Sequence, residues 1–173
     1  MAGALVAQIR KSGLKKRDQW IVTVGSSALM LLVLYAFLRW ASGIAPATPW
    51  VGDLALTIHL VTVIPAVPLG AYLLLFPKGT PTHRSLGKVW IALMFITATS
   101  TLWLRNINDG DFSWIHLFVP FTFYSGTRAV LYARRGEIQQ HRSEIIGMFV
   151  GALIIAGFAT FVPGRTMWVW AFG

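Results

Sequence analysis

The chain has 173 residues, about the size of one domain; 55% of them are hydrophobic, only 12% are charged, and the mean hydropathy is +0.63. A soluble domain carries roughly 25% charged residues, and a chain of this length could not bury so much apolar surface in one core, so an ordinary soluble domain is excluded. The lack of cysteine excludes disulfides, thiolate metal sites and thiol catalysis, and the net charge of +9 would indicate nucleic-acid binding if the protein were soluble.

Five apolar runs are each long enough to cross a bilayer as a helix, which needs about 20 residues. They cover residues 20–41, 54–76, 86–104, 112–132 and 145–162, and a basic tail at residues 1–19 precedes them. The first run exceeds the roughly 7–15 apolar residues of a signal peptide, so we expect it to be retained. The predicted fold is therefore an all-α integral membrane protein, with residues 20–173 forming one domain of five transmembrane helices.

Basic residues concentrate on one side of these spans. They lie in the N-terminal tail and around the connectors that follow the second and fourth spans: Arg10, Lys11, Lys15, Lys16, Arg17, Lys78, Arg84, Lys88, Arg128, Arg134, Arg135 and Arg142. Three acids share this side, which therefore carries the whole net charge of +9. The positive-inside rule predicts a bacterial inner-membrane protein with a cytoplasmic N-terminus and a periplasmic C-terminus. The excess charge then indicates contact with anionic lipid at the cytoplasmic face, and nucleic-acid binding is not expected.

The four histidines form two matched pairs. Ile-His-Leu surrounds His59 in the second span and His116 in the fourth, whereas His-Arg-Ser begins at His83 before the third span and at His141 before the fifth. This repetition indicates a duplicated two-helix hairpin, so that spans two to five form a four-helix bundle. At 1.5 Å per helical residue, His59 and His116 lie about 8 Å inside the outer boundary, and the other two lie at the cytoplasmic face.

Paired imidazoles at matched depth are what bis-histidine ligation of haem iron requires, with an apolar bundle to bury the macrocycle. We therefore predict that His59 with His116, and His83 with His141, bind one or two haem b groups. The alternative interpretation is that the histidines are polar residues of the membrane interface, or that the outer pair binds copper or zinc.

Basic side chains next to the inner pair suit the acidic groups of such a ligand. Arg84 and Arg142, together with Lys88, are predicted to pair with haem propionates, because a guanidinium binds a carboxylate through two hydrogen bonds. These residues could instead bind lipid headgroups.

Two resemblances follow from these motifs. Residues 83–90, His-Arg-Ser-Leu-Gly-Lys-Val-Trp, resemble the His-Arg-x-x-Gly-x-x-aromatic signature of an uncharacterised family of predicted bacterial inner-membrane proteins. This resemblance covers residues 54–162 and departs from the family after His141, where Ser-Glu-Ile replaces a further aromatic signature. The histidine pattern is also similar to the two-haem transmembrane cytochromes b of the ascorbate-reducible type, which have six spans. That similarity implies electron transfer between bis-histidine haems.

Three functions are therefore open. The first is a b-type cytochrome-like electron-transfer protein, with quinone as a partner for electron exchange. The second is a haem-free accessory or assembly subunit of a larger respiratory or photosynthetic membrane complex, or a homo-oligomer. The third is a small metal-binding membrane protein or carrier. Signatures of hydrolases, phosphate-binding loops and zinc proteases are missing from the sequence, so an enzymatic activity is left open and a subunit role is favoured.

Overall fold

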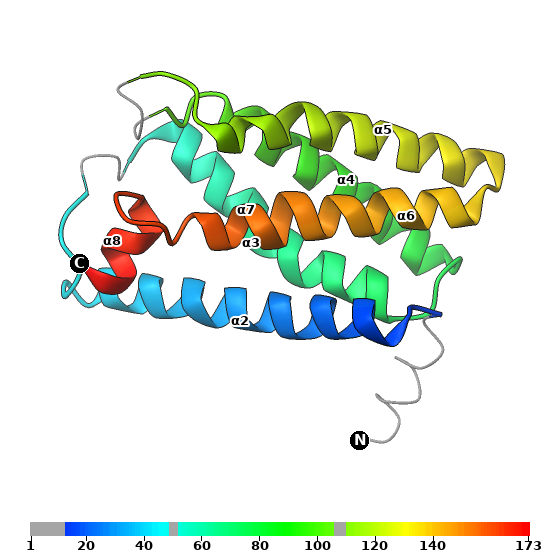
Figure 1. Cartoon of the computed structure of the whole chain (residues 1–173), viewed down its shortest axis with the longest axis horizontal. Helices are drawn as coiled ribbons and strands as arrows, with labels where there is room; N and C mark the ends of the chain where they lie inside the picture. The colour runs from blue at the N-terminus through cyan, green and yellow to red at the C-terminus, as the bar shows by residue number, and fades with distance from the viewer. Residues whose placement is uncertain (1–12, 49–51, 106–109) are drawn as a thin grey trace.

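The computed structural model describes residues 13–48, 52–105 and 110–173, and every regular element within these ranges is helical (Figure 1). The elements are α2 (Lys16–Ala41), α3 (Leu54–Leu75), α4 (Pro81–Thr101), the 3-10 turn η1 (Trp114–Leu117), α5 (Phe118–Arg135), α6 (Ile138–Met148), the π-helical segment η2 (Phe149–Ile155), α7 (Ala156–Ala159) and α8 (Thr166–Phe172). The predicted all-α class is confirmed.

Local sequence signals set the helix ends. The Asp53 carboxylate accepts a hydrogen bond from the backbone N–H two residues later at 2.7 Å, and the Thr80 hydroxyl accepts one from the N–H three residues later at 3.0 Å. Each side chain satisfies a backbone donor that the first helical turn leaves free, so α3 and α4 begin there. Gly136 ends α5 with φ of 74°, a conformation that costs other residues strain. Pro65 and Pro68 lie inside α3, which continues through both.

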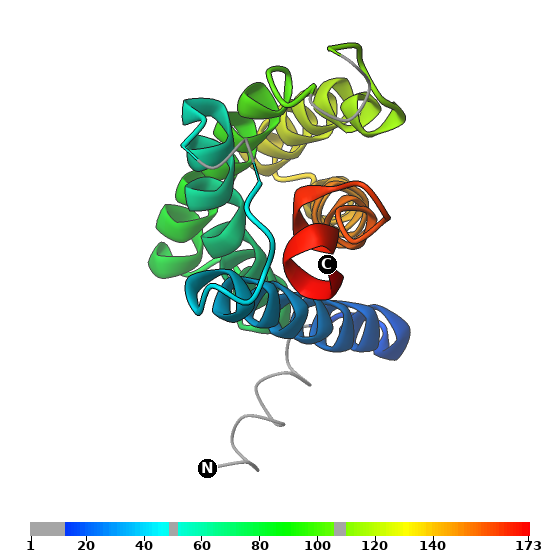
Figure 2. The ribbon, with the colours of Figure 1, turned by 90° about the vertical axis from the view of Figure 1, so that its left-hand side faces the viewer.

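The long helices follow one another around an arc. Seen end-on in Figure 2, α2, α3, α4 and α5 are neighbours in chain order, and the α6–η2–α7 segment lies in the open side of the arc. Segment η2 contacts α2, α3 and α5, which brings the end of the chain into the middle of the bundle. The short helix α8 then packs on α2.

Three helical stretches are long and apolar enough to cross a membrane: α2, α3, and the continuous run Ile138–Ala159 made by α6, η2 and α7. The predicted spans at residues 86–104 and 112–132 coincide with α4 and with η1 and α5, which are helical but do not meet the same measure of length and apolar composition. Five spans are therefore not established by the described residues.

Helix boundaries differ from the predicted spans at both ends of the bundle. At the end where α8 packs, helices stop short of the spans: α4 ends at Thr101 rather than residue 104, and α7 ends at Ala159 rather than residue 162. At the other end most helices are longer than predicted. Helix α4 begins at Pro81 rather than residue 86, α5 ends at Arg135 rather than residue 132, and α6 begins at Ile138 rather than residue 145. The basic tail predicted at residues 1–19 is already helical from Lys16. Hydropathy marks only the apolar part of a helix, whereas backbone hydrogen bonding continues through charged residues at its ends.

Helix α8 was not predicted, and it ties the C-terminus to α2. Trp170 is 2% exposed, its ring stacks on Trp40 with 5.2 Å between centroids, and its Nε1–H donates to the Thr48 hydroxyl at 3.2 Å. The Arg39 guanidinium donates to the Gly173 carbonyl at 2.8 Å and also to that of Ala171. Burial of a large aromatic surface explains why this segment folds back onto the bundle.

Candidate functional site

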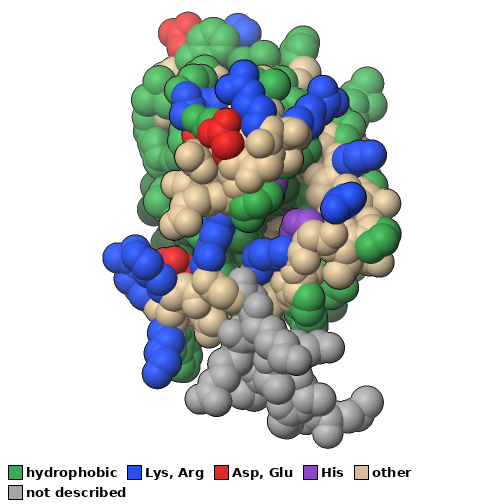
Figure 3. All heavy atoms as spheres, turned by 90° about the vertical axis from the view of Figure 1, so that its right-hand side faces the viewer, with side chains coloured by type: hydrophobic (Ala, Val, Ile, Leu, Met, Phe, Trp, Pro, Cys, Tyr) green, Lys and Arg blue, Asp and Glu red, His purple; other side chains and the backbone are tan. Residues whose placement is uncertain are grey.

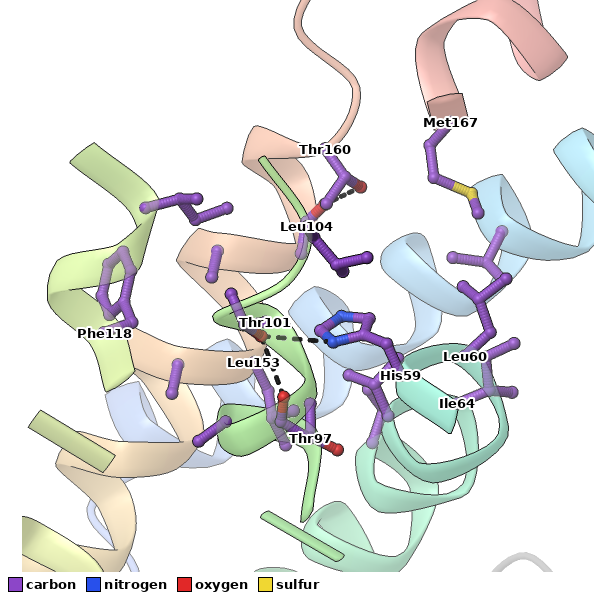
Figure 4. Close-up of a pocket in the computed structure, with 18 of the residues that line it drawn as sticks. His59, Leu60, Ile64, Thr97, Thr101, Leu104, Phe118, Leu153, Thr160 and Met167 are labelled. Atoms are coloured by element: carbon purple, nitrogen blue, oxygen red, sulfur yellow. Dashed lines mark hydrogen bonds between the residues drawn. The ribbon is translucent and has the colours of Figure 1, made fainter. Parts of the chain in front are cut away.

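A cavity of about 200 Å³ lies among the helices at the end of the bundle where α8 packs (Figure 4). Side chains from α2, α3, α4, η1, α5, η2, α7 and α8 line it, and most of them are apolar. Its polar lining consists of one histidine, one arginine and five threonines: His59, Arg165, Thr97, Thr101, Thr122, Thr160 and Thr166. An apolar cavity with a few polar groups is typical of a binding site for a small amphipathic molecule.

His59 presents an unprotonated ring nitrogen to this cavity. Its Nδ1 lies 3.2 Å from the hydroxyls of both Ser100 and Thr101, and those hydroxyls donate their own protons to the Thr97 carbonyl at 2.8 and 2.9 Å. With each hydroxyl giving its one proton to the Thr97 carbonyl, the matching tautomer of the neutral ring donates from Nδ1 and keeps its lone pair on Nε2. No described residue bonds to Nε2, and the ring projects into the cavity (Figure 4).

His116 is the second histidine at this end of the bundle. It is 7% exposed, and its Nε2 is a buried atom without a hydrogen-bond partner among the described residues. Its Nδ1 lies 3.0 Å from the Ser113 N–H and 3.1 Å from the Ser113 carbonyl. An N–H can only donate, so Nδ1 accepts and Nε2 carries the ring proton. A buried donor left without a partner costs free energy, which makes this atom a candidate contact for a ligand.

The two outer histidines come from different elements at this end of the bundle. Helix α4 separates α3 from η1 and α5 around the arc, and both α3 and the η1–α5 junction contribute to the lining (Figure 2). His59 lines the cavity directly. His116 does not, although Ile115 and Phe118 on either side of it do. The predicted pair is thus at one end of the bundle, with only one member in contact with the cavity.

The inner pair, His83 and His141, lies at the opposite end. His141 Nδ1 is 2.8 Å from the Ala129 carbonyl, which can only accept, so Nδ1 is the donor and Nε2 of the neutral ring keeps its lone pair. Burial lowers the pKa of His83, and the charges of His141 and Lys78 lower that pKa further. The two histidines are therefore close enough to interact electrostatically, but neither lines the central cavity.

Basic side chains gather at this end of the bundle (Figure 3). Burial and the charge of Arg142 lower the pKa of Lys78 to about 8, and its ammonium donates to the Leu74 carbonyl at 2.7 Å. Arg142 donates to the Gly13 carbonyl, and Arg84 is exposed. The propionate roles predicted for Arg84 and Arg142 stay predictions, and Arg142 already bonds to the chain itself.

A packed layer separates the inner histidines from the cavity. Trp90 and Phe149 are 1% and 0% exposed, and an ideal Cβ built on Gly70 would lie 2.6 Å from the Trp90 Nε1 and 2.7 Å from the Phe149 ring. The two rings thus fill the space that the missing side chain leaves. They are seven and eight residues along the helix from His83 and His141, which is about 11 Å at 1.5 Å per residue.

Sequence reasoning missed three groups of this site. Ser100 and Thr101, which fix the His59 ring, lie at the end of α4 in a Thr/Ser-rich stretch that could have been noticed next to a buried histidine. Arg165 is buried at 8% exposure and lines the cavity, whereas the sequence shows it only as a basic residue after a Pro-Gly turn. No cluster of three potential ligands for a bare metal ion occurs within the described ranges.

The comparisons with known proteins give a family and no closer relative. A family model described as "Predicted membrane protein (DUF2306)" matches residues 56–170, which is more than half of the chain. No curated protein and no solved structure matches the chain. The predicted resemblance to a membrane-protein family is confirmed, while the similarity to two-haem cytochromes b stays a prediction.

Proposed function

Because the chain belongs to the DUF2306 family of predicted membrane proteins, we propose that it is a multi-pass membrane protein that binds haem b in the central cavity and transfers electrons through it. One observation carries the proposal: among the described residues, neither His59 Nε2 nor His116 Nε2 has a hydrogen-bond partner, and both histidines lie at the same end of the bundle. Two imidazole nitrogens are the donor set that a bis-histidine haem needs, although only His59 of this pair lines the cavity.

The residues at this end fit a haem in part. Ser100 and Thr101 hold the proton of His59 on Nδ1, which is the arrangement a metal-ligating histidine needs, because its other nitrogen then faces the iron. For His116 to ligate through Nε2, its ring proton must move to Nδ1, where the Ser113 carbonyl at 3.1 Å would accept the hydrogen bond. The lining is mostly apolar, as burial of a macrocycle requires, but the cavity of about 200 Å³ is smaller than a haem, so binding requires the surrounding helices to move apart.

The inner end does not fit a second haem in the same way. Trp90 and Phe149 fill the bundle between the cavity and the level of His83 and His141, and we therefore assign one haem to the chain rather than two. When bound, haem supplies a one-electron couple. The chain's own residues orient the ligating imidazoles and exclude water from the cavity, and quinone in the bilayer is the proposed partner for electron exchange.

The proposed membrane topology has five spans, with α4 and α5 crossing beside the three apolar stretches in a four-helix bundle of two hairpins. The start of α2 and the α3–α4 and α5–α6 connectors lie at the same end of the bundle, where Lys and Arg side chains gather (Figures 1 and 3). By the positive-inside rule this end faces the cytoplasm of a bacterial inner membrane and contacts anionic lipid, and the C-terminus is periplasmic. The haem site is then near the periplasmic face.

A second function is favoured by one specific contact. With the Ser113 N–H donating to Nδ1, His116 offers an Nε2–H donor, whereas His59 offers an acceptor. A donor and an acceptor at the same end of the bundle suit a quinone headgroup, although only the acceptor, on His59, lines the cavity. In this alternative the protein is a haem-free accessory subunit of a larger membrane complex.

An absorption spectrum of the purified protein from haem-replete cells separates the two functions. For the proposed function, dithionite reduction gives sharp b-type α and Soret bands, with about one haem per chain. His59→Ala and His116→Ala each abolish these bands, whereas His83→Gln and His141→Gln keep them. A folded, colourless wild-type protein would refute the haem assignment, and tight binding of quinone by that sample would support the alternative.

A further inference from the structure

The Arg165 guanidinium is a buried cation without a hydrogen-bonding partner in the described part of the chain. Arg165 follows the turn between α7 and α8, is 8% exposed, and lines the same cavity as His59. Its guanidinium forms no hydrogen bond or ion pair with a described residue; its one recorded contact is the Trp114 ring, whose centroid lies 5.9 Å from the guanidinium carbon. Burial lowers the pKa of Arg165, as expected for a charge removed from water.

No acidic side chain offsets this cation within the described ranges. Among those residues Arg165 is the only Lys, Arg, Asp or Glu that is buried, and none of the residues that line its cavity is acidic. The less buried Arg128 pairs with Glu144 at 2.8 Å, and Arg39 donates to the Gly173 carbonyl at 2.8 Å. An isolated buried guanidinium is costly, so a structure that keeps one facing a cavity is suited to an anionic ligand.

The lining threonines leave this cation as the main unmatched polar group of the cavity. Four of their hydroxyls donate to backbone carbonyls or to another hydroxyl of the chain at 2.6–2.9 Å: Thr97, Thr101, Thr122 and Thr160. His59 is neutral in the tautomer described above and adds no negative charge. Most of the remaining lining is apolar. A ligand therefore meets one cation and a largely hydrocarbon wall.

The volume of the cavity limits the size of the ligand. The cavity holds about 200 Å³, and an engineered apolar cavity of about 150 Å³ binds benzene. A planar guanidinium matches a carboxylate through two parallel hydrogen bonds, and apolar walls favour a hydrocarbon body over a small, strongly hydrated anion. We propose that this cavity binds an amphipathic monocarboxylate slightly larger than benzene, with its carboxylate on Arg165 and its hydrocarbon body against the apolar lining.

This ligand fits the cavity as it stands, whereas haem requires the surrounding helices to move apart. The carboxylate site therefore goes beyond the haem assignment and does not depend on it. Each can fail without the other, because haem is detected by its absorption bands and a colourless carboxylate is not.

The test compares a carboxylate with its uncharged amide. Wild-type protein, Arg165→Gln, Arg165→Lys and the control Arg105→Gln are purified in detergent from haem-depleted cells, and each is titrated by calorimetry with benzoate, benzamide and inorganic phosphate. Benzamide has the shape of benzoate without the charge, and phosphate has the charge without an apolar body. Arg105 is the matched control because it is exposed and its Nε donates to the Leu102 carbonyl at 2.9 Å.

We expect wild-type protein to bind benzoate about 10- to 100-fold more tightly than benzamide, the range for a hydrogen bond to a charged group. Arg165→Gln should lose this preference and keep the wild-type affinity for benzamide, which shows that its cavity is intact. Arg165→Lys keeps the charge without the planar fork and should show an intermediate preference. Arg105→Gln should behave as the wild type does.

Four results would overturn the carboxylate site. They are no binding of benzoate by wild-type protein, equal affinity of wild-type protein for benzoate and benzamide, an unchanged preference in Arg165→Gln, and phosphate binding as tight as that of benzoate. If Arg165→Gln does not fold, the comparison of the two ligands in wild-type protein and in Arg165→Lys decides.

Discussion

Substituting Gly70 by alanine tests the packed layer that closes the cavity on its inner side. An ideal Cβ at this position would lie 2.6 Å from the Trp90 Nε1 and 2.7 and 2.8 Å from two carbons of the Phe149 ring, whereas carbon atoms pack best at about 3.5–4.0 Å. Neither ring is free to move, because Trp90 donates to the Ala66 carbonyl at 2.8 Å and Phe149 is 0% exposed. The clash must therefore be absorbed by displacement of the core.

The matched control is Gly87→Ala in α4, where an added Cβ meets nothing within 4 Å. Both positions are helical, so alanine should stabilise each by up to about 1 kcal/mol through helix propensity. Only Gly70→Ala also suffers overpacking, which costs about 1–3 kcal/mol. The gain in stability from helix propensity is similar in the two variants and cancels when they are compared. Gly70→Ala should therefore be less stable than Gly87→Ala by about 1–3 kcal/mol, the cost of overpacking.

Thermal unfolding of both variants in the same detergent measures this difference. For a chain of this size, the expected gap in Tm is about 2–12 °C, with Gly70→Ala the lower. Adding Phe149→Leu to Gly70→Ala should cost less than the two single changes together, because the narrower side chain makes room for the new methyl. A Gly70→Ala protein as stable as Gly87→Ala would refute the tight packing of these rings.

Three further predictions concern the site and the helix ends. Ser100→Ala combined with Thr101→Val removes both acceptors of the His59 Nδ1–H. In an absorption titration the double variant should bind haem about 10- to 100-fold more weakly, and an unchanged affinity would contradict the proposed orientation of the ring. Trp170→Ala should destabilise the protein by about 3–5 kcal/mol in thermal unfolding, and Trp168→Ala, at a less buried position, by much less; equal losses would argue against α8 docking through Trp170. Burial and neighbouring positive charges hold the pKa of His83 below its ordinary value of 6.5 in the folded protein. The unfolded chain therefore binds this proton more readily, and Tm should fall as the pH drops below about 6.5. His83→Gln should flatten that fall, and identical pH profiles of the two proteins would rule His83 out as its source.

Much of the fold was predictable because a bilayer leaves few choices. Long apolar runs in lipid must satisfy every backbone group internally, which makes them helices, and Pro, Gly and Asp residues mark where the helices end. Hydropathy did not predict α8, since a seven-residue helix is too short to register as a span and folds only by stacking Trp170 on Trp40.

The sequence by itself determined the helical membrane class, the side on which the basic residues gather, and the division of the histidines between two levels of the bundle. Tertiary structure alone decided which ring nitrogens are free, because the proton on His59 depends on hydroxyls from α4, 41 and 42 residues further along the chain. It also places Arg165 in the lining of the cavity that His59 contacts, and no local sequence pattern indicates that these two residues lie at one site. Hydropathy and charge patterns describe one helix at a time. A cavity is lined by several helices that come together only when the chain packs, so the sequence alone does not indicate which polar groups share it.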